Sequence, residues 1–360
     1  MGETHALRRR EVVRELRRRE LDCLLVTHPA NWFYLTGFTG DAGVLVVAQD
    51  TTTLITDGRF TSQAKEEALG MRVELQKGAL YDSLGARLKH WGTKRAGYDP
   101  GQWTVAQRKA LKKAIGTKCR DIAASGIVER LRMRKDAQEL SVMRRAAILA
   151  GDVLEEVLQL VRPGVRENEI GAEIEYQMKK RGASGASFET IVASGPRSAL
   201  PHARPTSKRL KKNELVVLDL GAILRHYCSD ITRTVHVGRA SQRIRKWYGA
   251  VQKAQEAAVA AVKAGVTCGD VDAAARRVLK KEGLEAYFVH STGHGLGLEV
   301  HEEPRVARGQ AIRLEPGNVI TIEPGIYVEG VGGIRIEDDV VVRFQGSEVL
   351  TRVRRDLIEL

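Results

Sequence analysis

Two acidic residues, Asp219 and Asp230, lie in a segment whose pattern predicts a β-hairpin. Residues 214–237 contain apolar runs rich in Val, Leu, Ile and Thr on both sides of a short break near Leu224 and Arg225. Because both acids lie equally far from this break, we expect their carboxylates to face each other on neighbouring strands. Like charges in that arrangement destabilise a sheet unless a cation compensates them. The hairpin therefore predicts a cation site, although taken alone it also fits an ordinary solvated surface.

A second hairpin with two acids is predicted at residues 319–342. Glu323 and Glu337 lie at equal distances from Gly330 in a glycine-rich turn, so their carboxylates are also expected to face each other. Two such hairpins in one chain are harder to explain as solvated surface. Together they predict the metal-binding core of an enzyme.

The two hairpins belong to two copies of one predicted unit, in which a helix pair and a connecting segment precede the hairpin. Five positions of the first copy recur 101 positions later. They are Val161, Gly164, Val165, Ile170 and Gly182, matched by Val262, Gly265, Val266, Val271 and Gly283. If the copies pack about a pseudo-twofold axis, the two acid pairs converge on one point. Four carboxylates in one cleft are strongly unfavourable alone, whereas two divalent ions neutralise them.

Three histidines could add a nitrogen ligand to the carboxylates. His290, His294 and His301 lie within twelve residues, in a stretch where glycines permit close approach of the backbone. Carboxylates alone suit Mg, Ca or Mn, whereas an added imidazole shifts the expectation toward Mn, Co, Fe or Zn.

Several segments together carry a family resemblance. They are ASGPRSALPH, VVLDLGA followed by YCSDITRT, GHGLGLEVHEEP, ITIEPGIY and GGIRIEDDV. In this combination and order they resemble the M24 metallopeptidases, in particular the proline-specific branch of Xaa-Pro aminopeptidase (aminopeptidase P) and Xaa-Pro dipeptidase (prolidase). The resemblance covers residues 136–360, and the phrases YLTGFTGDAGVL and TDGRFTSQA extend it over nearly the whole chain.

The resemblance implies two divalent metal ions as cofactors, Mn or Co in preference to Zn or Fe. Asp219 is expected to bind one ion, and His294 and Glu323 the other. Asp230 and Glu337 are expected to bridge the two ions. Glu323 is also expected to act as general base and then as proton donor.

The resemblance also implies residues that face the substrate. His202 and His301 match the histidines that hold the peptide and stabilise the tetrahedral intermediate. His290 matches a further pocket position, and Arg335 and Tyr327 are expected to steady the carboxylates from outside.

Two domains are expected. Residues 1–128 predict an N-terminal α/β domain similar to that of creatinase and prolidase, beginning with a helix over 5–20 and a strand over 22–26. Residues 129–360 are expected to form the α+β pita-bread catalytic domain with its internal pseudo-twofold repeat. Its first two helices are predicted at 136–161 and 167–181.

The substrate is expected to be a short proline-containing peptide, and the main hypothesis is an Xaa-Pro aminopeptidase, because the N-terminal phrases resemble the small members of that group. The alternative is an Xaa-Pro dipeptidase. Arg305, directly after HEEP, resembles the arginine with which prolidases bind the free carboxylate of a dipeptide. A more distant alternative is a non-catalytic peptide- or nucleic-acid-binding protein on the same fold.

The charge of the chain allows that distant alternative but does not favour it. The net charge is +13, from 58 Lys and Arg against 45 Asp and Glu, and such a surface attracts nucleic acid without specificity. Aromatic residues make up only 5% and no nucleic-acid motif accompanies the basic clusters, so no specific nucleic-acid partner is expected.

The sequence also predicts a location and an assembly. It contains neither an export signal nor an apolar run of about 18 residues, so no membrane partner is expected. The four cysteines are widely scattered, which fits a reducing cytoplasm. The family resemblance implies a homodimer.

Overall fold

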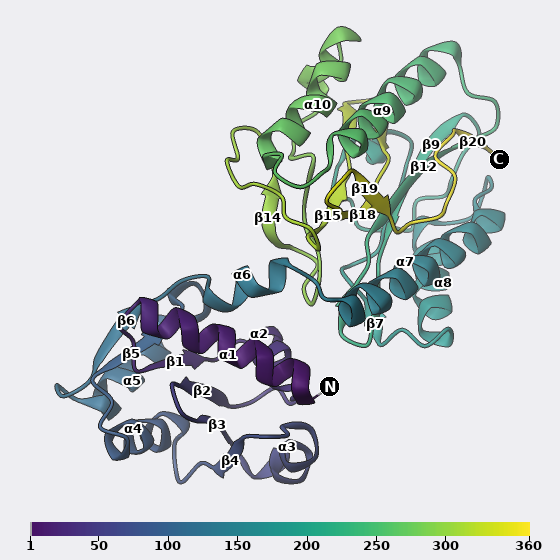
Figure 1. Ribbon diagram of the computed structural model, residues 1–360. Helices are drawn as coiled ribbons and strands as arrows, with labels where there is room; N and C mark the ends of the chain where they lie inside the picture. Colours follow the sequence, from purple (N-terminus) through teal and green to yellow (C-terminus); the bar gives the residue numbers. More distant parts are fainter. Residues whose placement is uncertain (1) are drawn as a thin grey trace. The chain divides into compact units, whose positions relative to one another are not determined.

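In the computed structural model, which describes residues 2–360, the chain divides into two units between Arg132 and Met133. Figure 1 shows the elements of both. No helix in this described part of the chain has the length and apolar content needed to span a membrane.

The N-terminal unit contains a six-stranded sheet with the strand order β4-β3-β2-β1-β5-β6. β1 pairs parallel with β5 and antiparallel with β2, so the sheet is mixed. The strands are β1 (Cys23–Val26), β2 (Val44–Ala48), β3 (Thr52–Thr56), β4 (Arg72–Leu75), β5 (Arg95–Tyr98) and β6 (Arg120–Ala123). Helices lie on both faces, which explains why the residues of β1 are all buried and apolar.

The helices of this unit form the outer layers of the sheet. They are α1 (Gly2–Arg18), α2 (Pro29–Thr36), α3 (Thr61–Glu67), α4 (Leu80–His90), α5 (Val105–Ile115) and α6 (Ile127–Met133), with short 3-10 turns η1 (Gly58–Phe60) and η2 (Pro100–Gln102). Leu84, Leu88, Leu111 and Ile115 of α4 and α5 share one core with the sheet. The initial helix and strand thus lie close to the predicted ranges.

The C-terminal unit contains two copies of a helix pair followed by strands. The first copy comprises α7 (Ala137–Val157), η3 (Leu158–Leu160), α8 (Glu167–Lys180), β7 (Gly185–Ala186), β8 (Ile191–Ser194), η4 (Gly195–Ala199), β9 (Glu214–Leu220), β10 (Ala222–Leu224), β11 (Tyr227–Cys228) and β12 (Ile231–Val237). The second comprises α9 (Gln242–Ala261), α10 (Cys268–Lys281), η5 (Glu285–Tyr287), β13 (Gly293–Gly295), β14 (Glu302–Val306), β15 (Val319–Ile322), β16 (Gly325–Val328), β17 (Gly332–Arg335), β18 (Asp338–Val342), β19 (Ser347–Val349) and β20 (Ile358–Glu359). Within each copy the two helices lie side by side (Figure 1).

The predicted internal repeat is confirmed by corresponding backbone contacts. Gly164 and Gly265 both have positive φ, 93° and 84°, in the turn before the second helix of each pair. Gly164 N–H donates to Leu210 O (2.9 Å), and Gly265 N–H donates to Leu314 O (2.8 Å). Each copy also has its own hydrophobic core between its helix pair and its strands.

The first acidic hairpin forms, but its predicted register is wrong. The two-residue turn consists of Arg225 and His226, both with positive φ (46° and 71°), whereas the prediction centred the break one residue earlier. Asp219 therefore pairs with Thr232 and not with Asp230. Since side chains alternate between faces, the two aspartates lie on one face as diagonal neighbours. The turn was misplaced because neither turn residue is glycine or asparagine.

The predicted register of the second hairpin is confirmed. Thr321 pairs with Asp339 in β15 and β18, and Gly325 pairs with Arg335 in β16 and β17. Both ladders are symmetric about Gly330, whose φ is 74°. Glu323 and Glu337 occupy the gap between the two ladders.

The two hairpins are joined by hydrogen bonds, one of them between backbone atoms. β9 and β12 belong to the sheet β20-β12-β9-β8, while β15 and β18 belong to the sheet β14-β13-β15-β18-β19. Glu337 N–H donates to Thr232 O at 3.1 Å, which links the two sheets. The acidic positions of both hairpins are thus brought to one place.

Candidate metal centre

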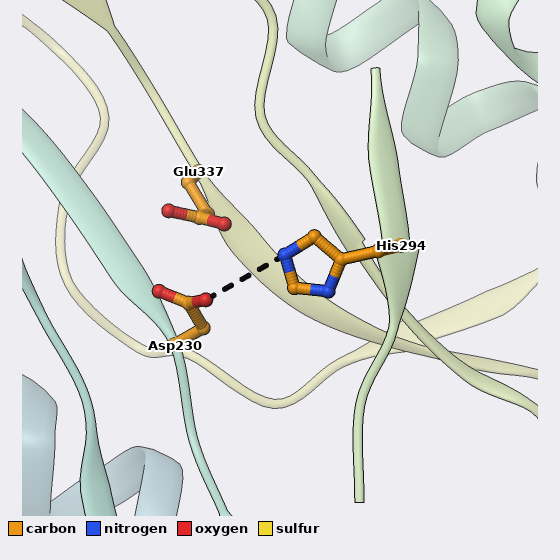
Figure 2. Close-up of side chains that lie close together, drawn as sticks. All are labelled: Asp230, His294 and Glu337. Atoms are coloured by element: carbon orange, nitrogen blue, oxygen red, sulfur yellow. Dashed lines mark ion pairs between the residues drawn. The ribbon is translucent and has the colours of Figure 1, made fainter. Parts of the chain in front are cut away.

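Three potential metal ligands converge between the two sheets. One ligand atom each of Asp230, His294 and Glu337 lies within 4.8 Å of the others. Asp230 directly precedes β12, His294 lies in β13, and Glu337 lies between β17 and β18. Figure 2 shows both carboxylates directed toward the imidazole ring. Two carboxylates and one imidazole form a donor set that suits a divalent transition metal.

The imidazole of His294 is oriented for ligation through Nε2. Nδ1 lies 3.0 Å from Gly295 O, an arrangement that favours the tautomer with a proton on Nδ1. Nε2 faces Asp230 Oδ2 at 3.8 Å and Glu323 Oε1 at 3.5 Å. Burial lowers the pKa of His294, which keeps the ring neutral and able to bind a metal.

Glu323 completes this side of the centre at the end of β15. Its backbone N–H donates to Thr292 O at 2.8 Å, which fixes the backbone from which the side chain projects. Burial raises the pKa of Glu323 to about 7; Asp219 raises it and Arg335 opposes the increase. A carboxylate with this pKa exchanges protons near neutral pH, as a general acid–base group requires.

Asp219 lies in β9 and is held by Arg335. Arg335 Nη2 donates to Asp219 Oδ2 at 2.5 Å, whereas the buried Oδ1 atom has no hydrogen-bond partner. The structure does not group Asp219 with the three converging ligands, but its charge raises the pKa of Asp230, Glu337 and Glu323.

The centre fits a bound cation electrostatically. Asp219, Asp230 and Glu337 are only 7%, 5% and 2% exposed. Burial raises the pKa of Asp230 well above its usual range, and the charge of Glu337 raises it further. Asp230 Oδ1, like Asp219 Oδ1, is buried without a hydrogen-bond partner. Divalent ions would bind these oxygens and offset the repulsion.

A hydrogen-bonded chain supports the carboxylates from outside. Arg335 Nη1 donates to Tyr327 Oη at 2.6 Å, and Tyr327 Oη lies 2.9 Å from His290 Nε2. Burial raises the pKa of Tyr327 to about 12 and lowers the pKa of His290 to about 4, so both are neutral at physiological pH. The predicted supporting residues are thus brought together with Asp219.

Sequence reasoning missed Thr232, which connects both hairpins. Its hydroxyl donates to Glu337 Oε2 at 2.6 Å and accepts from Arg335 Nε at 3.1 Å. The available signal was the two-residue period of a strand, which places Thr232 on the same face as Asp230.

The other predicted substrate residues are solvent-exposed. His202 follows η4, His301 precedes β14, and Arg305 lies within β14. The rings of His301 and His294 are edge to face, with centroids 4.4 Å apart. Burial lowers the pKa of His301, and His294 and His202 lower it further, which indicates that the two exposed histidines are neighbours. Arg305 donates its backbone N–H to Glu303 Oε2 at 3.1 Å, and within residues 2–360 its side chain forms no hydrogen bond or ion pair with a candidate ligand.

Comparisons with known proteins cover both units. Residues 141–343 match Metallopeptidase family M24, and residues 8–134 match the Creatinase/Prolidase N-terminal domain. The chain belongs to metallopeptidase family M24. It is therefore a hydrolase, and the predicted pita-bread fold behind a creatinase/prolidase N-terminal domain is confirmed. Family membership also implies divalent metal ions as cofactors.

Several members of family M24 are similar over their whole length. An Xaa-Pro dipeptidase of Pyrococcus furiosus is 36% identical over 349 residues, 97% of this chain and 98% of that protein. The structure of an Xaa-Pro dipeptidase from Bacillus anthracis has a TM-score of 0.96 at 38% identity and covers 99% of this chain and 100% of its own. An X-Pro aminopeptidase from Thermotoga maritima has a TM-score of 0.89 at 37% identity and covers 96% and 100%.

Proposed function

We propose that the chain is a dinuclear, metal-dependent Xaa-Pro dipeptidase (prolidase) that hydrolyses the bond before proline in dipeptides. The observation that carries this proposal is full-length similarity to proteins named Xaa-Pro dipeptidase or prolidase. The sequence had favoured an Xaa-Pro aminopeptidase, with the dipeptidase as alternative. The similar proteins support the alternative better, although two of them are named aminopeptidases.

Five residues would hold two divalent ions, with Mn or Co preferred over Zn or Fe: Asp219, Asp230, His294, Glu323 and Glu337. When bound, such ions polarise the scissile carbonyl and make a water molecule nucleophilic at neutral pH. The support for this set is the convergence of three of its members, the contact of Glu323 with His294, and the partnerless oxygen of Asp219.

Glu323 would move the proton during hydrolysis. Its carboxylate, whose pKa burial raises to about 7 in the metal-free site, would accept a proton from the attacking water and then donate it to the proline nitrogen. An Xaa-Pro bond is a tertiary amide without an N–H, so its nitrogen must gain this proton to leave as an amine.

His202 and His301 would hold the peptide and stabilise the oxyanion of the tetrahedral intermediate. Both side chains are exposed, and His202 contributes to the lowered pKa of His301, which supports placing the two side by side. Tyr327, His290 and Arg335 would keep Asp219 in place through their hydrogen-bonded chain. A homodimer in the cytoplasm, as expected from the sequence, is part of the same proposal.

Substrate length tests the proposal. With saturating Mn²⁺ or Co²⁺, the purified protein is expected to hydrolyse an Xaa-Pro dipeptide at least about tenfold better, by kcat/KM, than the matching Xaa-Pro-Xaa tripeptide, since binding a free carboxylate contributes about 1.5–3 kcal/mol. A preference for the tripeptide would instead establish the aminopeptidase activity. Hydrolysis of neither peptide would contradict both.

Arg305→Ala is expected to reduce kcat/KM for the dipeptide by roughly 10- to 100-fold, the effect of losing one charged hydrogen bond. The physical reason is that a guanidinium binds a carboxylate in bidentate fashion, and the dipeptide places its carboxylate next to the scissile bond. Initial rates on the dipeptide and the tripeptide measure the effect. Arg308→Ala provides the control, because Arg308 is exposed nearby and pairs with Glu285 (2.9 Å). Equal losses on both peptides would rule out carboxylate binding by Arg305.

A further inference from the structure

The loop at residues 195–205 carries His202 and is tied to the metal centre at its tip. Arg335 Nη1 donates to Pro201 O at 3.2 Å. The same guanidinium donates to Asp219 Oδ2 at 2.5 Å. The position of this loop therefore determines where His202 lies relative to the candidate ligands.

The base of this loop is held by one buried carboxylate, Glu167, the first residue of α8 and 0% exposed. Its Oε1 accepts from the N–H and the hydroxyl of Ser194, both at 2.8 Å. Its Oε2 accepts from the N–H of Thr206 at 3.1 Å, the hydroxyl of Thr206 at 2.8 Å and Arg197 Nε at 3.1 Å. Ser194 directly precedes the 195–205 loop and Thr206 directly follows it. One side chain thus joins both ends of the loop and one residue inside it.

Neighbouring cations strengthen this arrangement. Arg197 Nη2 also donates to Arg204 O at 2.6 Å, across the loop. Lys208 Nζ donates to Ser194 Oγ at 2.7 Å. A buried carboxylate is strongly unfavourable unless hydrogen bonds and charges compensate it, and Glu167 receives five hydrogen bonds. The loop cannot move at its base without breaking some of them.

The second copy of the repeat has no carboxylate at the corresponding position. Cys268 is the first residue of α10, as Glu167 is of α8, and it is also 0% exposed. Both helices begin with matching backbone bonds, from Glu167 N–H to Lys208 O (3.1 Å) and from Cys268 N–H to Ile312 O (2.9 Å). A thiol is a weak acceptor and cannot replace five hydrogen bonds. Of the two copies, the one that carries His202 has a carboxylate at this position and the other does not.

We propose that Glu167 is a positioning residue that fixes both ends of loop 195–205 and thereby holds His202 beside the metal centre. This inference rests on the peptide-binding role proposed for His202. Within residues 2–360, Glu167 hydrogen-bonds to the loop and its two flanking residues and to no candidate ligand, so we expect its effect to fall on peptide binding and not on metal binding.

Glu167→Gln is the first test, since Gln keeps the size but turns an N–H₂ group toward the hydrogen-bond donors of the loop. We expect kcat/KM for the Xaa-Pro dipeptide to fall about 10- to 100-fold, with unchanged Mn²⁺ affinity in a direct titration. Glu169→Gln is the matched control. Glu169 lies in the same first turn of α8, but within residues 2–360 its carboxylate is paired with Arg166 alone, accepting from its N–H at 2.9 Å and lying 4.0 Å from its Nε. Equal activities of the two variants would overturn the proposal.

A double-mutant cycle separates positioning from general destabilisation. If Glu167 acts through His202, Glu167→Gln should lower kcat/KM by no more than about twofold in a His202→Ala background. If the two losses multiply, Glu167 supports the fold and not His202, and the proposal is wrong.

Hydrogen exchange tests the loop directly and keeps the two proposals distinguishable. Segment 195–205 should exchange faster in Glu167→Gln than in Glu169→Gln, and equal exchange would overturn the positioning role. Full activity of His202→Ala would refute only the role of His202, because the exchange result still decides whether Glu167 fixes the loop.

If Glu167→Gln does not fold, Thr206→Val, which removes one of the five bonds, should show faster loop exchange and about two- to tenfold lower kcat/KM. Wild-type exchange in Thr206→Val would overturn the proposal.

Discussion

Asp230→Asn is expected to lower kcat/KM at least about a thousandfold while the protein stays folded. The neutral amide cannot replace a carboxylate that lies with His294 and Glu337 inside a 4.8 Å cluster. Losing about 4 kcal/mol of metal-dependent transition-state stabilisation corresponds to this factor. Peptidase assays at increasing Mn²⁺, together with measured metal content, quantify the loss.

The same substitution is expected to stabilise the metal-free protein at pH 8. Burial and the charges of Glu337 and Asp219 raise the pKa of Asp230. Folding raises the pKa of such a group above its value in the unfolded chain, which is about 3.9. The protonated group therefore adds to the free energy of unfolding below that pH, and the contribution is lost as the pH rises through the pKa of the folded state. The melting temperature of metal-free Asp230→Asn should therefore exceed that of wild type at pH 8, and the two should agree near pH 4.

Added metal should reverse the order of the two melting temperatures, because wild type binds the metal more tightly and binding to the native state is stabilising. Asp152→Asn is the control, since Asp152 is exposed on α7 and its replacement should change neither activity nor melting temperature. A metal-free Asp230→Asn protein that melts below wild type at pH 8 would show that the carboxylate is stabilised by contacts other than a cation.

The second hairpin was predictable in register because its turn is marked chemically. Glycines at the centre of 319–342 specify positive φ, and Gly330 adopts 74°. The first hairpin turns at Arg225 and His226, which reach positive φ without such a marker. Both turn residues are exposed, whereas the flanking Leu224 and Tyr227 are buried and Tyr227 Oη donates to Glu139 Oε1 at 2.8 Å. Such packing between distant segments cannot be read from local composition.

The two hairpins pointed to the four candidate carboxylates, and the family resemblance singled out His294 among the three histidines of the glycine-rich segment. The hydrogen-bond partners were less accessible. Thr232 joins Glu337 and Arg335 across two sheets, and Glu167 lies far in sequence from the loop ends it holds. Such contacts depend on how separate elements pack, so a strand period or a helix start cannot reveal the partner.

Glu323→Gln is expected to lower kcat by roughly 10²- to 10⁴-fold, the range typical for loss of a positioned general acid–base group. Gln has nearly the same shape, so the backbone contact from Glu323 N–H to Thr292 O (2.8 Å) should persist. What disappears is the carboxylate that would accept and return the proton. Steady-state kinetics on the Xaa-Pro dipeptide should show the loss in kcat, with KM changed much less.

Saturating metal distinguishes the two roles assigned to Glu323. If it is both ligand and proton carrier, the Gln variant binds Mn²⁺ more weakly, but filling the site at high Mn²⁺ restores occupancy without restoring kcat. Glu329→Gln is the control on the same hairpin, because Glu329 is exposed near the turn and should tolerate the change. If kcat returns to the wild-type value once the metal content does, Glu323 is a ligand alone. The proton must then be carried by another group, and the exposed His202 and His301 would be the nearest candidates to replace in turn.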